Sequence, residues 1–249
     1  ATDRDAAFLS GKLDGMLTDY PGATLLQAKG SRLRLVMETD GSLSLIASKK
    51  SNVRNPDGLK GKNISVSGNT FVEYATDEVM KRACLHPGEV NKPEINNIPL
   101  RLMMLEDGQI SASFLPGPAT AIALNDGHTA LLNTRQMGLH CTGIVFSEKA
   151  ITEKDEEIRR FITGYNLGVK YLQTHPQNEW TEILVKEFGL QEKAAMQIDL
   201  PDYRPATRPS YHDIEKIIAW LKSKGAIPDY YPGENLVDTT FIPGTLKPQ

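Results

Sequence analysis

Three turns in this chain combine small or polar side chains with the expected start of a helix. They are the Asp19 turn (residues 18–21, TDYP), the Ser67 turn (residues 67–70, SGNT) and the Pro116 turn (residues 115–118, LPGP). In an open α/β sheet, ligands bind beyond the carboxyl ends of the strands and close to helix N-termini. We therefore predict that these turns carry whatever binding chemistry the chain has.

The Ser67 turn is the strongest of the three candidates. Helix N-terminal N–H groups attract an oxyanion or a carbonyl oxygen, and Ser67, Asn69 and Thr70 add polar side chains. Gly68 has no Cβ and would let a ligand approach the backbone closely. The same residues also fit a structural interpretation, in which Thr70 is a helix N-cap and Glu73 completes a capping box. The turn alone leaves both interpretations open.

The other two turns offer different chemistry. Asp19 would present a carboxylate to an amine or amide donor and would disfavour a second negative charge nearby. Its alternative role is to cap a helix that begins at Pro21. Tyr20 could stack on a planar ligand or be a half-buried rim residue, and Pro116 and Gly117 close the corresponding strand of the third turn.

Motifs for catalysis and metal binding do not occur in the sequence. It has no Gly-x-Ser-x-Gly elbow, no P-loop and no His-Glu-x-x-His. The five histidines stand singly, and the neighbours His140 and Cys141 would point to opposite faces of a strand. Cys84, among apolar neighbours on a predicted helix, is expected to be a buried free thiol. We expect no catalytic residues, no metal site and no cofactor.

Composition narrows the class of partner. With 249 residues, 40% apolar residues and 24% charged residues, the chain has an ordinary globular profile and can bury one large core or two ordinary ones. A net charge of −3 gives no electrostatic footprint for nucleic acid. No apolar run reaches the length of a membrane span. The composition therefore gives no indication of a nucleic-acid or membrane partner.

An internal repeat positions two of the turns. Residues 11–30 align without a gap on residues 108–127, an offset of 97 positions, and a proline and two glycines coincide. Each copy predicts a helix, a short strand, a turn and a second helix, with proline at the start of the second helix and glycine at its end. The repeat predicts two similar α/β lobes, and strands that alternate with helices predict parallel sheets in both.

The repeat also predicts that one unit is missing. A strand–helix–strand unit that starts near Leu59 precedes the second copy, whereas nothing equivalent precedes the first. By symmetry, the first βα unit of lobe 1 is absent from this sequence. A sheet without its central strand would leave an open edge, which favours self-association.

Four segments resemble the type II solute-binding proteins of ABC importers, in the group that handles nitrate, taurine, aliphatic sulfonates and thiamine-pyrimidine precursors. The segments are DRDAAFLSGKLDGMLTDYPGA, GLKGKNISVSGNTFVEYATDEVM, DGQISASFLPGPATAIAL and TGIVFSEKAI. The resemblance implies a two-lobed type II periplasmic-binding-protein fold, with a mostly parallel sheet flanked by helices in each lobe. Lobe 1 would comprise residues 1–49 and 142–249, lobe 2 residues 50–141, and the hinge strands residues 43–48 and 142–147.

The resemblance also implies a site between the lobes. By position, its ligand-facing residues would be Asp19, Ser67, Asn69, Thr70 and the Pro116–Gly117 turn, with Tyr20 and Gly68 beside them. The chain departs from the family pattern at Ser111, where aspartate is frequent, and in lacking the first strand and helix, whose loop normally touches ligand.

The function implied is capture of a small polar or heterocyclic metabolite and its delivery to an ABC permease. Such a protein would be periplasmic or extracellular, held at the membrane by the permease or a lost lipoprotein anchor. The alternative is a biosynthetic enzyme on the same fold, of the yeast thiamine-pyrimidine type, but the isolated Cys84 and Cys141 offer no cysteine-rich motif. A regulator's effector-sensing domain would require a helix-turn-helix segment, and the sequence contains none.

Overall fold

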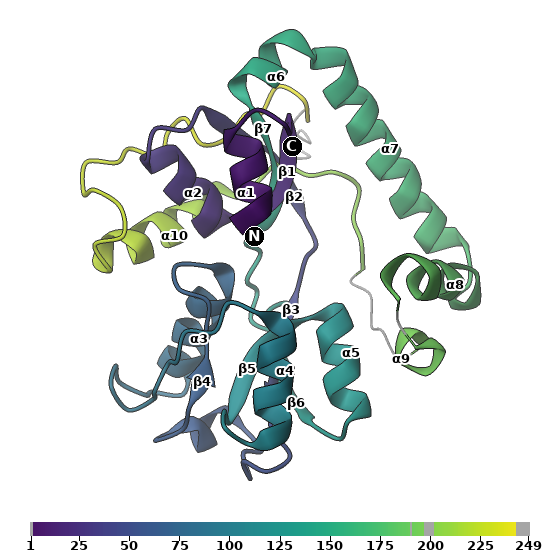
Figure 1. The fold of residues 1–249 in the computed structure, drawn as a ribbon. Coiled ribbons are helices and arrows are strands. Elements are labelled where there is room, and N and C mark those ends of the chain that lie inside the picture. Colours follow the sequence, from purple (N-terminus) through teal and green to yellow (C-terminus); the bar gives the residue numbers. More distant parts are fainter. Residues whose placement is uncertain (1, 190, 197–201, 243–249) are drawn as a thin grey trace, which may run out of the picture. The chain divides into compact units, whose positions relative to one another are not determined.

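The computed structural model describes residues 2–189, 191–196 and 202–242, and the chain divides into two compact units (Figure 1). Unit 1 contains residues 1–40, 140–174 and 202–249, and unit 2 contains residues 41–139 and 175–201. Each unit is an α/β structure built on its own sheet. No helix among the described residues is long and apolar enough to cross a membrane.

Unit 1 is built on a three-stranded sheet with the order β1-β7-β2. The strands are β1 (Gly15–Asp19), β2 (Leu33–Thr39) and β7 (Thr142–Ser147). β7 runs antiparallel to both of its neighbours, so β1 and β2 are parallel to each other. The helix α2 (Tyr20–Ala28) connects them.

Unit 2 repeats this arrangement and adds one strand. Its sheet has the order β4-β5-β3-β6 and contains β3 (Leu43–Ala47), β4 (Ile64–Ser65), β5 (Ala112–Pro116) and β6 (Thr129–Asn133). Here β3 lies antiparallel between β5 and β6, which are connected by α5 (Gly117–Asn125). β4 pairs in parallel with the other edge of β5. Among the described strands, β1 has no such neighbour on its outer edge.

The predicted α/β class is confirmed, and in each described sheet every strand but one, β7 or β3, runs in the same direction. Only the β4–β5 ladder is parallel among the strand pairs described. The helix-connected strands do run in the same direction, as a right-handed crossover requires. In each sheet, however, a strand from a distant segment inserts antiparallel between them. Local alternation of strands and helices predicts the crossover and contains no signal for the inserted strand.

The predicted lobe boundaries differ from the observed units. Residues 43–48 were assigned to lobe 1, yet β3 pairs only with strands of unit 2 among those described. Residues 175–201, also assigned to lobe 1, group with unit 2. The ladders of β3 therefore move the first boundary from residues 49/50 to residues 40/41. A hinge role for β3 and β7 stays a prediction.

The repeat is confirmed element by element. β1 and α2 together span residues 15–28, and β5 and α5 span residues 112–125, which is an offset of 97 at both ends. α1 (Thr2–Leu9) and α4 (Ile98–Asp107) precede the two strands. Gly30 and Gly127 follow the second helices with φ of 95° and 86°, a left-handed conformation that glycine adopts without strain.

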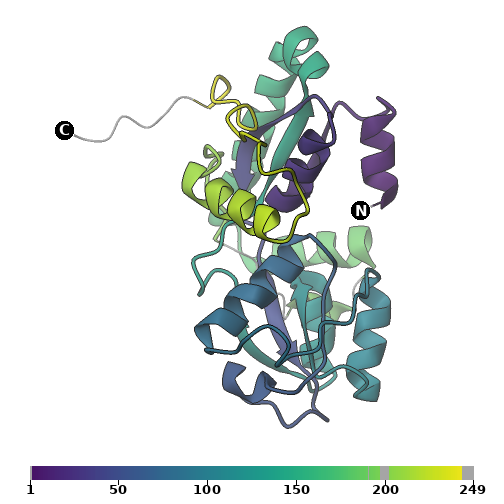
Figure 2. The same ribbon diagram turned by 90° about the vertical axis from the view of Figure 1, so that its left-hand side faces the viewer.

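The remaining helices begin largely where the predicted caps lie. Thr70 accepts a hydrogen bond from Val72 N at the start of α3, and Ser210 accepts one from Asp213 N at the start of α10. α10 packs against α2 within unit 1 (Figure 2). The helical elements not yet given bounds are η1 (Pro56–Leu59), α3 (Phe71–Arg82), α6 (Glu148–Glu153), α7 (Asp155–Thr174), α8 (Gln177–Phe188), α9 (Glu192–Met196) and α10 (Tyr211–Ser223).

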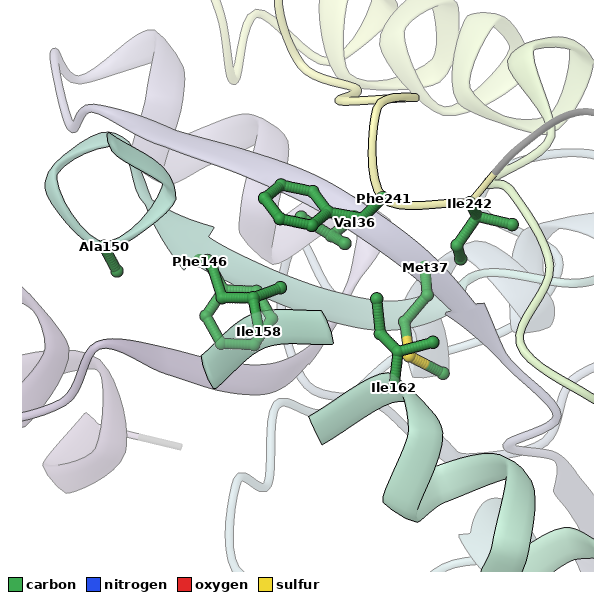
Figure 3. Close-up of a cluster of buried hydrophobic side chains, with 8 residues drawn as sticks. All are labelled: Val36, Met37, Phe146, Ala150, Ile158, Ile162, Phe241 and Ile242. Carbon is green, nitrogen blue, oxygen red and sulfur yellow. The ribbon is translucent and has the colours of Figure 1, made fainter. Parts of the chain in front are cut away.

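A buried cluster joins the sheet of unit 1 to α6, α7 and the C-terminal segment (Figure 3). Ile158 and Ile162 are four positions apart on α7, so both face the sheet. Each large aliphatic side chain buried in this way contributes about 1.5–3 kcal/mol. The cluster comprises Val36, Met37, Phe146, Ala150, Ile158, Ile162, Phe241 and Ile242.

The predicted burial of Cys84 is wrong. Its side chain is exposed, because α3 ends at Arg82 and Cys84 lies beyond the helix with a φ of 52°. The apolar pattern of the helix extends to Val79 and Met80, which are buried. The apolar spacing therefore predicted the helix correctly, but the predicted helix extended beyond its observed end at Arg82.

Candidate functional site

The Ser67 turn joins β4 to α3 and is half-buried at all four positions. The Thr70 hydroxyl donates to Ser67 O (2.8 Å) while it accepts from Val72 N (3.2 Å). Asn69 has a φ of 56°, and its N–H donates to the Glu73 carboxylate (2.7 Å). The capping interpretation is thus confirmed, and a ligand role for the same residues stays a prediction.

The structure brings the Ser67 turn and the Pro116 turn to the same edge of one sheet. β4 and β5 are parallel and in register, with Ile64 opposite Ala112 and Ser65 opposite Ser113. The two turns that follow these strands therefore lie side by side. Pro116 is the N-cap of α5 and forms no side-chain capping bond, and a Cβ on Gly117 would meet nothing within 4 Å.

Arg101, on α4, donates hydrogen bonds both to the Ser67 turn and to β5, the strand that leads into the Pro116 turn. Its side chain is buried, with the residue only 2% exposed. Nε donates to Ile95 O (2.6 Å), Nη1 to Phe114 O (3.4 Å) and Nη2 to the Ser67 hydroxyl oxygen. All three acceptors are neutral, and burial lowers the pKa of the Arg101 guanidinium. No ion pair recorded within the described part of the chain includes Arg101.

The backbone of Gly68 is already approached by a carboxylate. A Cβ placed on Gly68 would lie 3.0–3.1 Å from the carboxylate atoms of Glu94. Glu94 is exposed, and its Oε1 accepts from Asn96 Nδ2 (3.1 Å). In this structure the space beside Gly68 is used by a carboxylate of the protein itself, and the approach of a ligand at Gly68 stays a prediction.

In unit 1, Asp19 caps α2 and accepts from Gly22 N (2.7 Å). This confirms the capping alternative, and a ligand role for Asp19 stays a prediction. Tyr20 is not a rim residue, because it is 0% exposed. Its hydroxyl donates to Glu38 Oε2 (3.1 Å), and burial, followed by the Glu38 charge, raises its pKa.

The burial of Tyr20 has a simple cause. Its N–H donates to Cys141 O (2.8 Å), which continues the β1–β7 ladder by one residue. The ring then packs over Gly143, where an added Cβ would lie 3.2 Å from Tyr20 Cε1. Stacking of this ring on a ligand is therefore corrected to a structural role in the core of unit 1.

The sequence interpretation missed a charged cluster in unit 1. The Arg204 guanidinium contacts Asp40 Oδ1 (2.7 Å) and Glu38 Oε1 (2.8 Å), and Arg204 N donates to Asp40 Oδ2 (2.8 Å). Both carboxylates are nearly buried. Arg204 neutralises one of the two charges and fixes residues 38–40 at the end of β2.

Arg101 was also missed, although a signal was present. Extending the repeat alignment from residue 11 back to residue 4 places Arg101 on Arg4. Arg4 Nη1 donates to Leu17 O (2.8 Å), the carbonyl that corresponds to Phe114 O. The two arginines are therefore structural equivalents in the two units.

Two open pockets of about 690 and 630 Å³ lie elsewhere in unit 2. One is lined by α8 and α9, and the other lies at the C-terminal end of α3. Neither is lined by a residue of the three turns. No group of His, Cys, Asp and Glu side chains within the described segments could hold a metal ion.

The comparison with protein families decides the classification. The family model described as NMT1/THI5 like matches residues 1–179. The chain belongs to the NMT1/THI5-like family. Among curated proteins, none matches the sequence at a significant level.

Solved structures with the fold of this NMT1/THI5-like protein include three binding proteins. The aliphatic sulphonate binding protein SsuA of Escherichia coli has a TM-score of 0.79 at 14% identity, covering 98% of this chain and 82% of its own. The ligand-binding component of an ABC-type import system from Staphylococcus aureus has a TM-score of 0.77 at 15% identity, covering 97% and 84%. The alkanesulfonate-binding protein SsuA of Xanthomonas axonopodis pv. citri, bound to MOPS, has a TM-score of 0.75 at 18% identity, covering 90% and 79%. At these identities the likeness establishes the periplasmic-binding-protein fold.

Proposed function

We propose that this NMT1/THI5-like protein is the substrate-binding component of an ABC import system, which captures a small polar metabolite and delivers it to a permease. The observation that carries the proposal is the meeting of the Ser67 and Pro116 turns at one sheet edge of unit 2. Helix N-termini and a half-buried serine there offer donors to a small ligand.

The structural neighbours support the choice of first ligands. Two are described as sulfonate-binding proteins and a third as the ligand-binding component of an importer. Alkanesulfonates are therefore the first probes for this protein, followed by nitrate and amino-pyrimidines. A location outside the cytoplasm is proposed from the periplasmic neighbour, and attachment to the membrane through the permease is proposed with it.

Within unit 1, Asp19 is proposed as a further ligand contact. Its carboxylate lies at the end of β1 and accepts from Gly22 N at 2.7 Å. A carboxylate there favours a ligand that carries an amine or amide donor. Asp19→Asn would keep the cap and remove the charge, which makes it the variant that tests this contact.

Isothermal titration calorimetry with an alkanesulfonate panel tests the binding function. Asn69→Gly removes the side chain from the Ser67 turn at a φ of 56°, where glycine is unstrained. Asn52→Gly is a matched control, because Asn52 has a φ of 58° and lies outside the three turns. We expect Asn69→Gly to weaken binding about tenfold and Asn52→Gly to leave it unchanged.

The proposal includes the absence of catalysis, and turnover is the measurement that separates it from the enzyme alternative. The protein would be incubated with each bound compound, and the compound would be recovered and analysed by mass spectrometry. Quantitative recovery is expected. Conversion that depends on protein concentration would favour the enzyme alternative, and failure of every compound to bind would overturn the binding function.

A further inference from the structure

The charge on Arg101 has no counter-ion among the described residues. Buried arginines are normally paired with a carboxylate, because removing a charge from water is costly. Arg101 instead donates to two backbone carbonyls and to the Ser67 hydroxyl oxygen. These neutral acceptors satisfy its N–H groups and leave its positive charge uncompensated.

Arg101 also determines whether the Ser67 hydroxyl donates or accepts a hydrogen bond toward a ligand. A serine hydroxyl has one proton to donate and lone pairs that accept. The Ser67 oxygen accepts from the charged guanidinium, and no recorded hydrogen bond of the described residues uses the Ser67 hydroxyl as a donor. A donor polarised by a cation binds most strongly to a negatively charged acceptor. Ser67 thus presents a proton to a ligand oxygen.

The acidic groups near the turn form no ion pair with Arg101 in the described part of the chain. Glu73 and Asp77 share Lys92, at 3.3 and 2.7 Å, which offsets one of their two charges. Glu94 forms no ion pair with another described residue, and its carboxylate lies against Gly68. A carboxylate therefore already occupies the position where the turn approaches a ligand, and it would have to move aside for one.

The other copy of the repeat provides an internal comparison. Arg4 makes the same bond to a strand carbonyl, but it also pairs with Asp5 at 2.7 Å. The residue that corresponds to Asp5 in the second copy is Leu102, which packs against the core of unit 2. Holding the strand carbonyl thus does not require an uncompensated charge, and unit 2 lacks the carboxylate that unit 1 has.

We propose that Arg101 is a positioning residue that acts through Ser67 and makes the Ser67 turn selective for an anionic group. The substrate class would be a small metabolite with an oxyanion, such as a sulfonate, a carboxylate or a phosphate. This inference rests on the proposed function and narrows it, because amino-pyrimidines and other neutral compounds are excluded as preferred ligands.

The test compares matched ligand pairs that differ in charge. Titration calorimetry at constant ionic strength would use ethanesulfonate against ethanesulfonamide and butyrate against butyramide. In the wild-type protein the anionic member is expected to bind at least about tenfold more tightly. The ratio of the two dissociation constants is the readout, because a general loss of structure would weaken both members.

Three variants assign the ratio to Arg101. Arg101→Gln is expected to reduce the ratio to about one, and Arg101→Lys to keep part of it because the charge remains. Arg82→Gln removes a charge of the same sign from unit 2, where Arg82 donates to Met137 O, and should leave the ratio unchanged. If circular dichroism shows that Arg101→Gln does not fold, Ser67→Ala replaces it, since loss of the donor should lower the ratio.

We expect Glu94→Gln to change the ratio of the two dissociation constants in the direction opposite to Arg101→Gln. Removing the carboxylate that rests against Gly68 should raise the affinity for the anionic members and leave the neutral members unchanged. Equal binding of both members by the wild-type protein, or an unchanged ratio in Arg101→Gln and Ser67→Ala, would overturn the inference while the binding function stands. Failure of all four compounds and of the wider panel would instead overturn the binding function.

Discussion

Arg4 and Arg101 each donate a guanidinium N–H to the backbone carbonyl thirteen residues further along the chain. The acceptors are Leu17 O at 2.8 Å and Phe114 O at 3.4 Å. The two bonds occupy the same position in the two copies of the repeat. The surroundings of the two arginines differ. Arg4 is partly exposed and pairs with Asp5, whereas Arg101 is buried and donates to the Ser67 hydroxyl oxygen.

The different surroundings predict different costs of truncation. Arg101→Leu would remove the donor that Arg101 supplies to two buried carbonyls and to the half-buried Ser67 oxygen, and we expect it to lower the free energy of unfolding by about 2–4 kcal/mol. Arg4→Leu removes a partly exposed ion pair and should cost about 0–1 kcal/mol. Urea unfolding of both variants measures the difference. Equal costs would contradict the structural distinction between the two arginines.

Tyr20→Phe should affect stability and leave ligand affinity unchanged. The buried hydroxyl donates to the Glu38 carboxylate, so its loss should cost about 1–3 kcal/mol. The ring lies in the core and should not touch a ligand. Tyr211→Phe, at an exposed position, is the control and should change neither quantity. A stable Tyr20→Phe protein with weakened binding would instead assign the Tyr20 hydroxyl a role in ligand binding.

From the surroundings of His128 we predict that the folded protein loses stability in mild acid. Its Nδ1 accepts from Lys49 N (3.1 Å), which requires a neutral ring, and burial lowers its pKa. Because the folded pKa lies below the unfolded one, the unfolded state binds the proton first. Stability is therefore full above the unfolded pKa of about 6.5 and is lost as pH falls below it.

The measurement is the free energy of unfolding at several pH values between 5 and 7.5. His128→Gln should flatten this dependence, whatever its effect on stability at pH 7.5. His212→Gln, at an exposed position on α10, should keep the wild-type slope. An unchanged slope in His128→Gln would assign the dependence to other groups.

The open edge of β1 predicts concentration-dependent self-association. Among the described strands, β1 is an outer strand of the unit 1 sheet, and Leu17 on it is 54% exposed, whereas the corresponding strand β5 is paired with β4. Exposed strand edges pair with other chains, and a charged residue there prevents it. Light scattering should detect association of the wild-type protein, and Leu17→Lys should reduce it. Leu124→Lys, on α5, is the matched control. A wild-type protein that stays monomeric at every concentration would contradict this prediction.

Features that depend on local sequence could be predicted well. Residues 15–28 and 112–125 were found from proline, glycine and apolar spacing, and the cap at Thr70 from its own short motif. The direction of β7 and β3 could not be found in this way, because their partners are distant in sequence. Tyr20 was placed wrongly for the same reason, since Gly143 and Glu38 decide its burial.

Arg101 marks the limit of prediction for the candidate site. Its place in the repeat is visible in the sequence, since it aligns with Arg4. Its uncompensated charge is not visible, because that depends on which carboxylates lie within reach once the chain has folded. The sequence therefore identifies the Ser67 turn as a candidate, and the structure supplies the reason to expect an anion there.

The interleaving of the two units has a consequence for synthesis on the ribosome. All four strands of the unit 2 sheet lie within the continuous segment of residues 41–139. The unit 1 sheet needs β7, whose Thr142 follows Asp19 by 123 positions, and Leu35 on β2 bonds to Leu236 O and Asp238 N. A nascent chain would thus complete the sheet of unit 2 while β1 and β2 still await their middle strand, and these early strands are the part most exposed to misassembly during translation.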